Sequence, residues 1–433
     1  MGRERVALRD VIGAFAVLLL AAGPAWAQAP SPIRIGVLND MSGPYADLSG
    51  KGSVVAAQMA ADDFAAEASP GAPKVEILSA DHQNKADVGA SIARSWVDKD
   101  GVAAVVDVPN SAVALAVNRV MRDKDRAFLA SSTATSDLTG PQCAPTTVQW
   151  TFDTWALANG TARALVRQGG KTWFFIGSDY ALGAALIRDA SAVIAAGGGS
   201  VLGDVRAPLG TTDLSSYILQ AQASTADVVG VANAGDDLVN TVKQAAEFGI
   251  GRDGKQRMAG LLVFLTDVQA MGLPTAQGLL LTEAFYWDLN DATRAWSRRF
   301  AARDGGRMPT MNHAGVYSET LAYLRAAAAA GSVSGRAVVA RMAASPIADP
   351  LFGPTTIRPD GRAVHAMYLF RVKKPGDSTG PYDLYDVVAT IPPGEAFRPL
   401  AEGGVDARWW LRLPPELPDT AVSPEEARAL DPR

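Results

Sequence analysis

The sequence contains few of the residues on which disulfide-linked and metal-dependent proteins rely. It has one cysteine, Cys143, so no disulfide can form within the chain. Its histidines, His82, His313 and His365, lie far apart, and no H-E-x-x-H or C-x-x-C motif is present. The sequence therefore predicts no metal and no cofactor, and it leaves stabilisation to the hydrophobic cores.

Excess positive charge and long apolar runs are also absent. Lys and Arg number 40 against 45 Asp and Glu, which gives a formal net charge of −5. This balance provides no field that attracts nucleic acid or anionic lipid. Beyond the N-terminus, the best apolar run, Ala326 to Gly331, falls far short of the roughly 20 residues that a membrane span needs. The sequence therefore predicts a globular protein that does not bind nucleic acid.

Motifs for catalysis and nucleotide binding are missing too. The segment Ser49 to Ser53 resembles the end of a phosphate-binding loop, but Tyr45 stands where its first glycine belongs and Gly52 where Ser or Thr does. The segment Gly331 to Gly335 has valine, not serine, at the centre of a G-x-S-x-G pattern. Because no nucleophile with a base is apparent, we predict that the protein is not an enzyme.

The N-terminus is typical of a secretory signal peptide. Three arginines precede an apolar run from Val11 to Ala22, and the tripeptide Ala25-Trp26-Ala27 follows it. The run is too short to span a bilayer, and the A-x-A pattern predicts cleavage after Ala27. We therefore expect residues 1–27 to be removed and the mature protein to begin at Gln28 in the periplasm.

After this segment, apolar strand-like runs alternate with segments of helical period. The expected strands are 33–38, 75–79, 102–108, 126–130, 172–177, 201–205, 227–231 and 258–264. The expected helices are 52–64, 88–98, 112–121, 181–196, 214–223 and 238–248. Such alternation indicates parallel sheets with right-handed crossovers. The sequence therefore predicts an α/β protein with two Rossmann-like lobes.

The last third of the chain departs from this alternation. Residues 278–287 are predicted to be extended, and helices are expected at 292–303, 313–330 and 335–344. Residues 352–373 have the pattern of a hairpin, because Asp360-Gly361 supplies the positive φ of a tight turn. From Ile391 onwards prolines are frequent, and we expect a loosely ordered tail.

Three stretches of the sequence resemble one known family. They are P-I-R-I-G-V-L-N-D-M-S-G-P-Y-A from Pro32, V-P-N-S-A-V-A-L-A-V from Val108 and I-R-P-D-G-R-A-V-H-A-M-Y-L-F-R-V-K from Ile357. These are similar to the type I periplasmic solute-binding proteins of ABC importers, in the leucine/isoleucine/valine-binding branch. The resemblance runs in order from about Pro32 to Leu400.

The resemblance implies two lobes joined by three crossover segments, with a small-molecule ligand in the cleft and the closed form presented to a membrane permease. The crossovers are expected near 149–153, 282–287 and 346–354. The expected division is a signal peptide (1–27), lobe 1 (28–150 and 284–347), lobe 2 (151–283 and 348–395) and a Pro-rich C-terminal tail (396–433). We expect a monomer.

In lobe 1, polar residues follow two predicted strands. Asn110 and Ser111 follow strand 102–108, and Ser132, Thr133 and Ala134 follow strand 126–130. Ligands of open parallel sheets bind beyond the carboxyl ends of the strands, where hydroxyl and N–H groups hold carboxylates or amides. The same residue types cap helices, so both roles stay open. By resemblance, these positions hold the carboxylate and ammonium of the ligand, and Tyr45 in the first loop is a further pocket candidate.

In lobe 2, the resemblance implies that Tyr180 closes over the ligand and that Asp267 stands for a family glutamate that pairs with the ligand ammonium. Asp267 alternatively caps a short helix at 268–271. Tyr286 is a candidate for the pocket floor, and alternation places it opposite Phe285 and Trp287. Where relatives place an aromatic ring, this chain has Asn233 and Ala234, which favours a ligand bulkier or more polar than leucine.

These residues predict a zwitterionic or amide ligand. The candidate set includes Asp267 but no Lys or Arg, so a purely anionic ligand would meet an unpaired carboxylate. We therefore predict an extracytoplasmic protein that captures an amino acid or a related nitrogenous solute. If Asp267 only caps a helix, aromatic or other carboxylic acids are equally suitable ligands. A ligand-sensing component of a receptor system is the other alternative.

Overall fold

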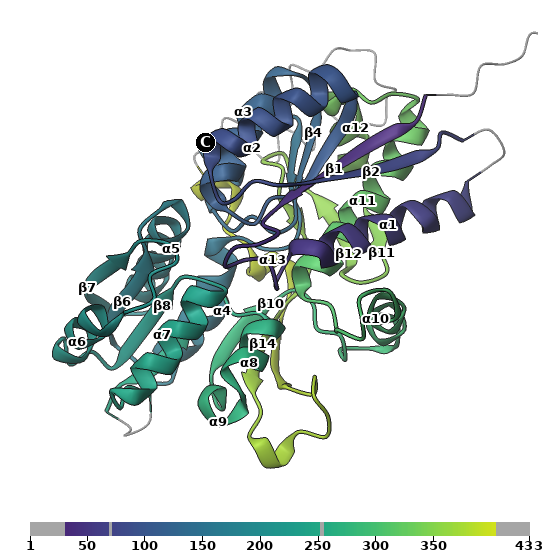
Figure 1. Cartoon of the computed structure of the whole chain (residues 1–433). Coiled ribbons are helices and arrows are strands. Elements are labelled where there is room, and N and C mark those ends of the chain that lie inside the picture. Colours follow the sequence, from purple (N-terminus) through teal and green to yellow (C-terminus); the bar gives the residue numbers. More distant parts are fainter. Residues whose placement is uncertain (1–30, 69–71, 252–254, 404–433) are drawn as a thin grey trace, which may run out of the picture.

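The computed structural model describes residues 31–68, 72–251 and 255–403. Figure 1 shows two α/β lobes: lobe 1, at the top, contains the N-terminal strands, and lobe 2, at the lower left, contains the teal elements. The predicted signal peptide, residues 1–27, lies outside the described residues.

Lobe 1 is built on a parallel five-stranded sheet in the order β2-β1-β3-β4-β5. Its strands are β1 (Ile33–Asn39), β2 (Val75–Asp81), β3 (Val102–Asp107), β4 (Ala127–Ala130) and β5 (Thr147–Gln149). One face packs against α1 (Gly50–Glu67) and α11 (Met311–Ala330), and the other against α2 (Ala86–Ser95) and α3 (Ser111–Asp123). Because β3 and β4 are buried at every position, they appear in the sequence as continuous apolar runs.

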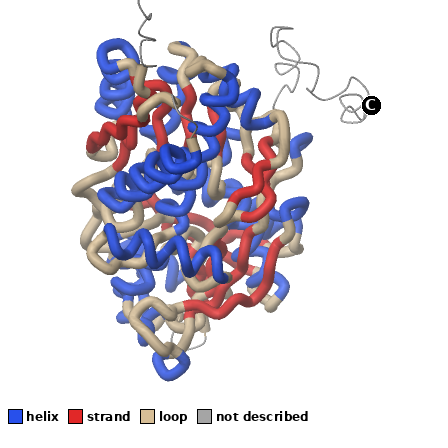
Figure 2. The backbone as a smooth tube through the Cα atoms, turned by 90° about the vertical axis from the view of Figure 1, so that its right-hand side faces the viewer, coloured by secondary structure: helices blue, strands red, loops and turns tan. Residues whose placement is uncertain are grey.

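Lobe 2 contains two sheets. The first is parallel, in the order β7-β6-β8-β9, and consists of β6 (Thr172–Ser178), β7 (Ser200–Ala207), β8 (Val228–Ala232) and β9 (Arg257–Gly260). The second is antiparallel, in the order β10-β14-β15, and consists of β10 (Leu280–Glu283), β14 (Met367–Val372) and β15 (Tyr385–Ile391). Figure 2 shows from the side that helices flank the strands in both lobes.

The helices of lobe 2 include α4 (Thr154–Arg167), α5 (Ala181–Ala196), α6 (Ser215–Ala223), α7 (Asp236–Glu247), α8 (Leu265–Met271) and α9 (Leu273–Ala276). The remaining helices are α10 (Asp291–Arg303), α12 (Gly335–Ala343) and α13 (Pro393–Ala396), and the short helical turns are η1 (Trp96–Asp100), η2 (Ser136–Thr139), η3 (Pro375–Asp377) and η4 (Leu400–Glu402). None of the helices within the described residues combines the length and apolar character that crossing a membrane requires.

The predicted α/β class with two parallel-sheet lobes is confirmed. Most boundaries shift by a few residues, and two expected strands end well before their predicted limits. The strand expected at 258–264 ends at Gly260, because α8 begins at Leu265 and the Asp267 carboxylate accepts from the Phe264 N–H. The extended segment expected at 278–287 is a strand only to Glu283.

The hairpin expected at 352–373 forms only in its first part. A small antiparallel sheet joins β11 (Ile347–Asp349), β12 (Gly353–Ile357) and β13 (Ala363–Val364), and β13 pairs with β12 over two residues. The chain then leaves at His365 and Ala366, and β14 pairs with β10 and β15 instead. The expected division into lobes stays a prediction, and this pairing favours a third connection at 365–366 over one at 346–354.

The segment after Ile391 is packed against the rest of the molecule as far as Gly403. The side chain of Phe397 is 3% exposed, and Ala396 is buried beside it. The expectation of a loosely ordered tail is therefore wrong for residues 391–403, since an aromatic anchor outweighs the local proline content. Residues 404–433 of the predicted tail lie outside the described residues.

Candidate functional site

The lobes meet at two tyrosines. Tyr45 lies in the loop after β1 and Tyr180 in the loop after β6, and their hydroxyl oxygens are 2.5 Å apart. Burial raises the pKa of both phenols above the ordinary value, so both stay neutral and one donates to the other. The structure thus brings together two residues that the sequence placed in the cleft from opposite lobes.

A second contact between the lobes lies beside this pair. The backbone N–H of Asp236 donates to the carbonyl of Pro44 over 3.2 Å. Gly235 has φ +60, and a Cβ at this position would lie 2.2 Å from the same carbonyl oxygen. Only glycine fits here, because both the positive φ and the close approach exclude a side chain.

Asp40 shapes the loop that carries Tyr45. Its carboxylate accepts from the backbone N–H of Gly43 at 2.7 Å and of Tyr45 at 3.0 Å, and from Asn84 Nδ2 at 2.7 Å. Aspartate commonly closes such turns by bonding to backbone a few residues ahead. The loop is therefore held from within and from the end of the neighbouring strand β2.

At the start of α3, the two predicted polar residues have different roles. Asn110 is the N-cap, and its Oδ1 accepts from the N–H groups of Ala112 at 3.0 Å and Val113 at 3.1 Å. Ser111 is fully buried, and its hydroxyl has no hydrogen-bond partner within the described part of the chain. Asn110 therefore serves the helix, and Ser111 is the member of the pair with a hydroxyl left for another molecule.

Asp107, a residue that sequence reasoning missed, organises lobe 1 at the end of β3. Its buried carboxylate accepts from Asn39 Nδ2 at 3.0 Å, from Ser49 Oγ at 2.9 Å and from Ser132 Oγ. Burial raises the pKa of Asp107, and these donors oppose that effect. The only sequence signal for this role is a charged residue at the end of an otherwise apolar strand.

The backbone turns sharply after this strand. Asp107 has φ +82 and Val108 has φ +58, a conformation that is unusual for a β-branched residue. A strained backbone conformation of this kind persists only where the surrounding contacts enforce it, and such positions are frequent at binding sites. Here Thr133 Oγ1 donates to the carbonyl of Val108 over 2.6 Å and fixes the turn.

The loop 132–134 is therefore bound to its own lobe through its side chains. The hydroxyls of Ser132 and Thr133 both donate to protein groups, and the carbonyl of Ala134 accepts from the N–H of Thr154 at 2.7 Å. Gln149 Nε2 donates to the carbonyl of Thr133 over 2.8 Å. The loop is thus tied to the first connection between the lobes.

In lobe 2, buried polar atoms lie at the ends of β6 and β8. Asn233 Nδ2 donates to Thr241 Oγ1 over 3.0 Å, whereas Asn233 Oδ1 and Ser178 Oγ lack partners among the described residues. Ala234 beside them is 2% exposed. Ser178 was not among the predicted site residues, although it directly follows the predicted strand 172–177.

Asp267 caps α8 with one of its oxygens. Oδ2 accepts from the N–H of Phe264 at 2.9 Å, as the capping alternative expected. Burial, followed by the nearby charges of Asp236 and Asp47, raises the pKa of Asp267 to about 7, although the Phe264 N–H lowers it. A cation beside this carboxyl would restore its ionised form.

Tyr286 does not join the other candidates. Its hydroxyl donates to the carbonyl of Tyr382 over 2.8 Å and accepts from the N–H of Leu384, and its ring lies 4.9 Å from that of Tyr385. Trp287 Nε1 donates to the same carbonyl. The expectation that alternation separates Tyr286 from Trp287 is wrong, because β10 ends before these residues and the period of two no longer holds.

Acidic groups surround the contact between the tyrosines. The charges of Asp40 and Asp237 add to the effect of burial on the pKa of Tyr45 and Tyr180. Neither of these two aspartates, nor Asp236, forms an ion pair with a described residue. The region between the lobes is therefore electronegative.

A family model for periplasmic binding proteins matches residues 32–379. This chain belongs to the periplasmic binding protein family. The resemblance to the leucine/isoleucine/valine-binding branch is confirmed. The protein is a periplasmic solute-binding protein of an ABC transporter, and, like its family, it is not an enzyme.

Solved structures and curated relatives agree with this family assignment. A periplasmic binding protein from Burkholderia mallei is 44% identical, with a TM-score of 0.82, over 86% of this chain and 98% of its own. A branched chain amino acid ABC transporter periplasmic ligand-binding protein from Burkholderia xenovorans LB400 is 41% identical, with a TM-score of 0.75 and the same coverage. Leu/Ile/Val-binding protein homolog 6 of Brucella melitensis is 29% identical over 275 residues, which are 62% of this chain and 67% of that protein.

Proposed function

We propose that this protein captures an amino acid or a related small nitrogenous solute between its lobes and delivers it to the permease of an ABC importer. The observation that carries this proposal is the electronegative region between the lobes, where the charges of Asp236 and Asp47 act on the buried carboxyl of Asp267. A ligand ammonium there would relieve the mutual repulsion of these carboxylates. The 41% identical protein from Burkholderia xenovorans, named for branched-chain amino acids, supports the same class.

The opposite end of such a ligand finds neutral donors in lobe 1. The hydroxyl of Ser111, unpartnered among the described residues, lies at the first turn of α3 and can donate to a carboxylate or amide oxygen. A solute that carries only a carboxylate would face the aspartates without a compensating charge. The unpartnered Asn233 Oδ1 and Ser178 Oγ favour a polar ligand side chain over a plain aliphatic one.

We further propose that the protein acts in the periplasm as a monomer and that its mature form begins at Gln28. The order of arginines, apolar run and A-W-A tripeptide supports this start. Intact mass of periplasmic material is expected to correspond to residues 28–433. A mass that includes residues 1–27, or a lipid adduct, would contradict the proposed cleavage.

The Asp267→Asn variant tests the ligand class. Asparagine keeps an oxygen that accepts from the Phe264 N–H, so the cap survives while the charge is lost. After a thermal-shift screen of L-amino acids and benzoate, calorimetry on the best amino acid is expected to show at least about tenfold weaker binding by the variant.

Asp213→Asn is the matched control, because Asp213 also accepts a backbone N–H at a helix start but is exposed. Its affinity is expected to equal that of the parent. Unchanged affinity in Asp267→Asn, or a parent protein that prefers benzoate, would overturn the ammonium-pairing proposal.

Ser111→Ala and Ser132→Ala are expected to differ. The Ser111 hydroxyl has no partner among the described residues, so its removal is expected to weaken binding of the identified amino acid by about 1 to 3 kcal/mol and to leave the ligand-free protein equally stable. Ser132 donates to buried Asp107, so its removal is expected to lower the free energy of unfolding as well. Calorimetry and urea unfolding of both variants check this, and equal affinity in Ser111→Ala would remove Ser111 from the site.

A further inference from the structure

The chain after β15 crosses from one lobe to the other on the side of the connections. We define residues 393–403 as the C-terminal strap. At its start, Asn159 Nδ2 from α4 of lobe 2 donates to the carbonyl of Glu395 over 2.6 Å. Further along, Arg398 Nη2 donates to the carbonyls of Ser136 at 3.2 Å and Thr139 at 3.4 Å, both in η2 of lobe 1. The strap therefore holds both lobes.

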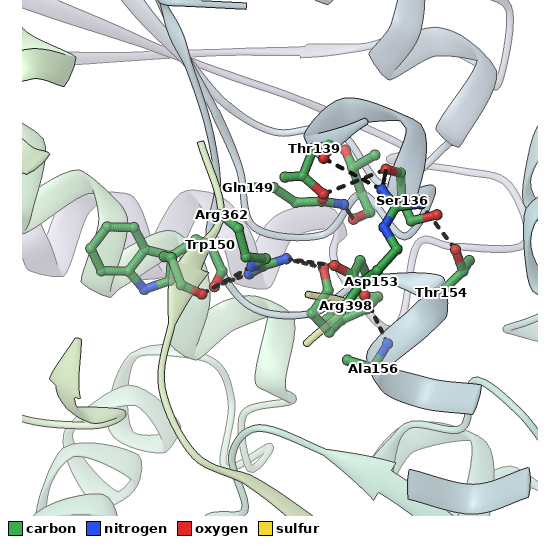
Figure 3. A network of polar contacts seen from close by, with 12 residues as sticks. Ser136, Thr139, Gln149, Trp150, Asp153, Thr154, Ala156, Arg362 and Arg398 are labelled. Carbon is green, nitrogen blue, oxygen red and sulfur yellow. Dashed lines mark hydrogen bonds and ion pairs between the residues drawn. The ribbon is translucent and has the colours of Figure 1, made fainter. Parts of the chain in front are cut away.

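Between these two attachments, the strap covers a buried cation. The ring of Phe397 lies 4.5 Å from the guanidinium carbon of Arg362, which is fully buried. Arg362 donates to the carbonyls of Trp150 and Phe152 and lies 3.7 Å from a carboxylate oxygen of Asp153 (Figure 3). Arg362, from the segment before the third connection, thus meets residues 150–153 of the first connection beneath the ring of Phe397.

The turn η2, to which Arg398 is attached, makes the contacts that join the lobes on this side. Ser136 Oγ donates to Asp189 Oδ2 over 2.6 Å, and Asp137 is 2.9 Å from Arg188, with both partners on α5 of lobe 2. The same turn closely follows the loop 132–134 in the chain. In Figure 3, Arg398 reaches towards Ser136 and Thr139 from the strap.

A further hydrogen bond fixes the strap itself. Arg358 Nη1 from the end of β12 donates to the carbonyl of Arg398 over 2.7 Å, and Arg358 is in turn paired with Asp360. Arg398 is thus held from the hairpin side and reaches η2 with its side chain. Arg398 thus ties the strap to η2, while Asn159 on α4 ties the start of the strap to lobe 2, so separation of η2 from α5 changes the span that the strap bridges.

We propose that the C-terminal strap sets the equilibrium between open and closed lobes, with Arg398 as a positioning residue that holds η2 against α5. The strap makes its contacts in a structure whose lobes touch at Tyr45 and Tyr180, so it favours the closed arrangement. This role concerns lobe closure alone and stands whichever solute the protein binds.

The Arg398→Gln variant tests this role without any added solute. Because the carbonyls of η2 lose their cationic donor, we expect amide hydrogen exchange at residues 132–139 to become at least about tenfold faster, while exchange in β6 and β8 stays unchanged. Small-angle scattering is expected to show a larger radius of gyration, since the open population grows. Arg371→Gln, which removes a side chain that is 56% exposed and paired only at 3.8 Å with Asp386, is the matched control and is expected to change neither quantity.

Two further variants separate positioning from simple support. Arg398→Lys keeps a cation that donates to the same carbonyls and is expected to restore slow exchange at 132–139. If Arg398→Gln does not fold, Phe397→Leu, which loosens the strap over Arg362, is measured in its place by the same hydrogen exchange and scattering experiments. Unchanged exchange and radius in a folded variant, or faster exchange spread evenly over the whole chain, would overturn the proposal.

Discussion

Replacing Arg362 by Met is expected to lower the free energy of unfolding by about 3 to 5 kcal/mol. Burial lowers the pKa of this guanidinium only to about 10, so it remains charged at neutral pH. Its removal leaves Asp153 without its nearest countercharge, takes the donor from the carbonyl of Phe152 and leaves the carbonyl of Trp150 only its contact with His365 Nε2. Urea unfolding measures the change.

Arg371→Met provides the comparison for this prediction. Arg371 pairs with Asp386 at the surface, and such pairs contribute about 1 kcal/mol or less. A loss below about 1 kcal/mol in Arg362→Met would mean that the apolar surroundings of Phe397 accommodate methionine as well as the buried ion pair.

His313→Gln is expected to remove part of the sensitivity of the protein to acid. The Thr310 N–H donates to Nδ1 of His313, and Nε2 lies 2.8 Å from the carbonyl of Ser49, so the ring is neutral with its proton on Nε2. Protonation of Nδ1 would place its N–H against the N–H of Thr310, so that two hydrogen-bond donors would face each other. Burial, opposed by the bond to Ser49, lowers the pKa of His313 to about 4.

The sign of the pH effect follows from this lowered pKa. The unfolded chain takes up the proton first, near its ordinary pKa, so the contribution of neutral His313 is complete above that value and is lost as the pH falls towards 4. The difference in unfolding free energy between the parent and His313→Gln is therefore expected to shrink by about 3 kcal/mol between pH 7 and pH 4. A difference that stays constant over this range, in urea titrations at several pH values, would show that folding does not lower the pKa of His313.

The local sequence pattern was sufficient to predict most of the fold. The runs at β1, β3 and β6 are long, apolar and followed by helical period, so their place in parallel sheets followed from the sequence. At 258–264 the same rule failed, because apolar composition continues through Phe264 while the backbone turns to begin α8. Apolar content alone does not mark where a strand stops.

Only part of the candidate site could be predicted from the sequence. Tyr180 was identified through the family resemblance and Tyr45 as an aromatic residue in the first loop, and their contact depends on how the lobes close. Asp107 had no such signal, because its role arises from Asn39, Ser49 and Ser132, which lie on three separate segments. Phe397 was missed for the same reason: its partner Arg362 is distant in sequence, while nearby prolines suggested a loose tail.

The second sheet of lobe 2 has a consequence for dividing the protein into fragments. Its middle strand, β14, joins β10 only after the chain has passed through α10, α11 and α12 beside lobe 1. An N-terminal fragment that ends anywhere between residues 284 and 366 retains β10 but lacks the strand that covers Leu281 and its neighbours. During synthesis, the apolar cluster around Leu281 and Phe370 therefore cannot form until most of the polypeptide has been made. A lobe 2 that folds independently would require a gene that joins its two separated stretches directly.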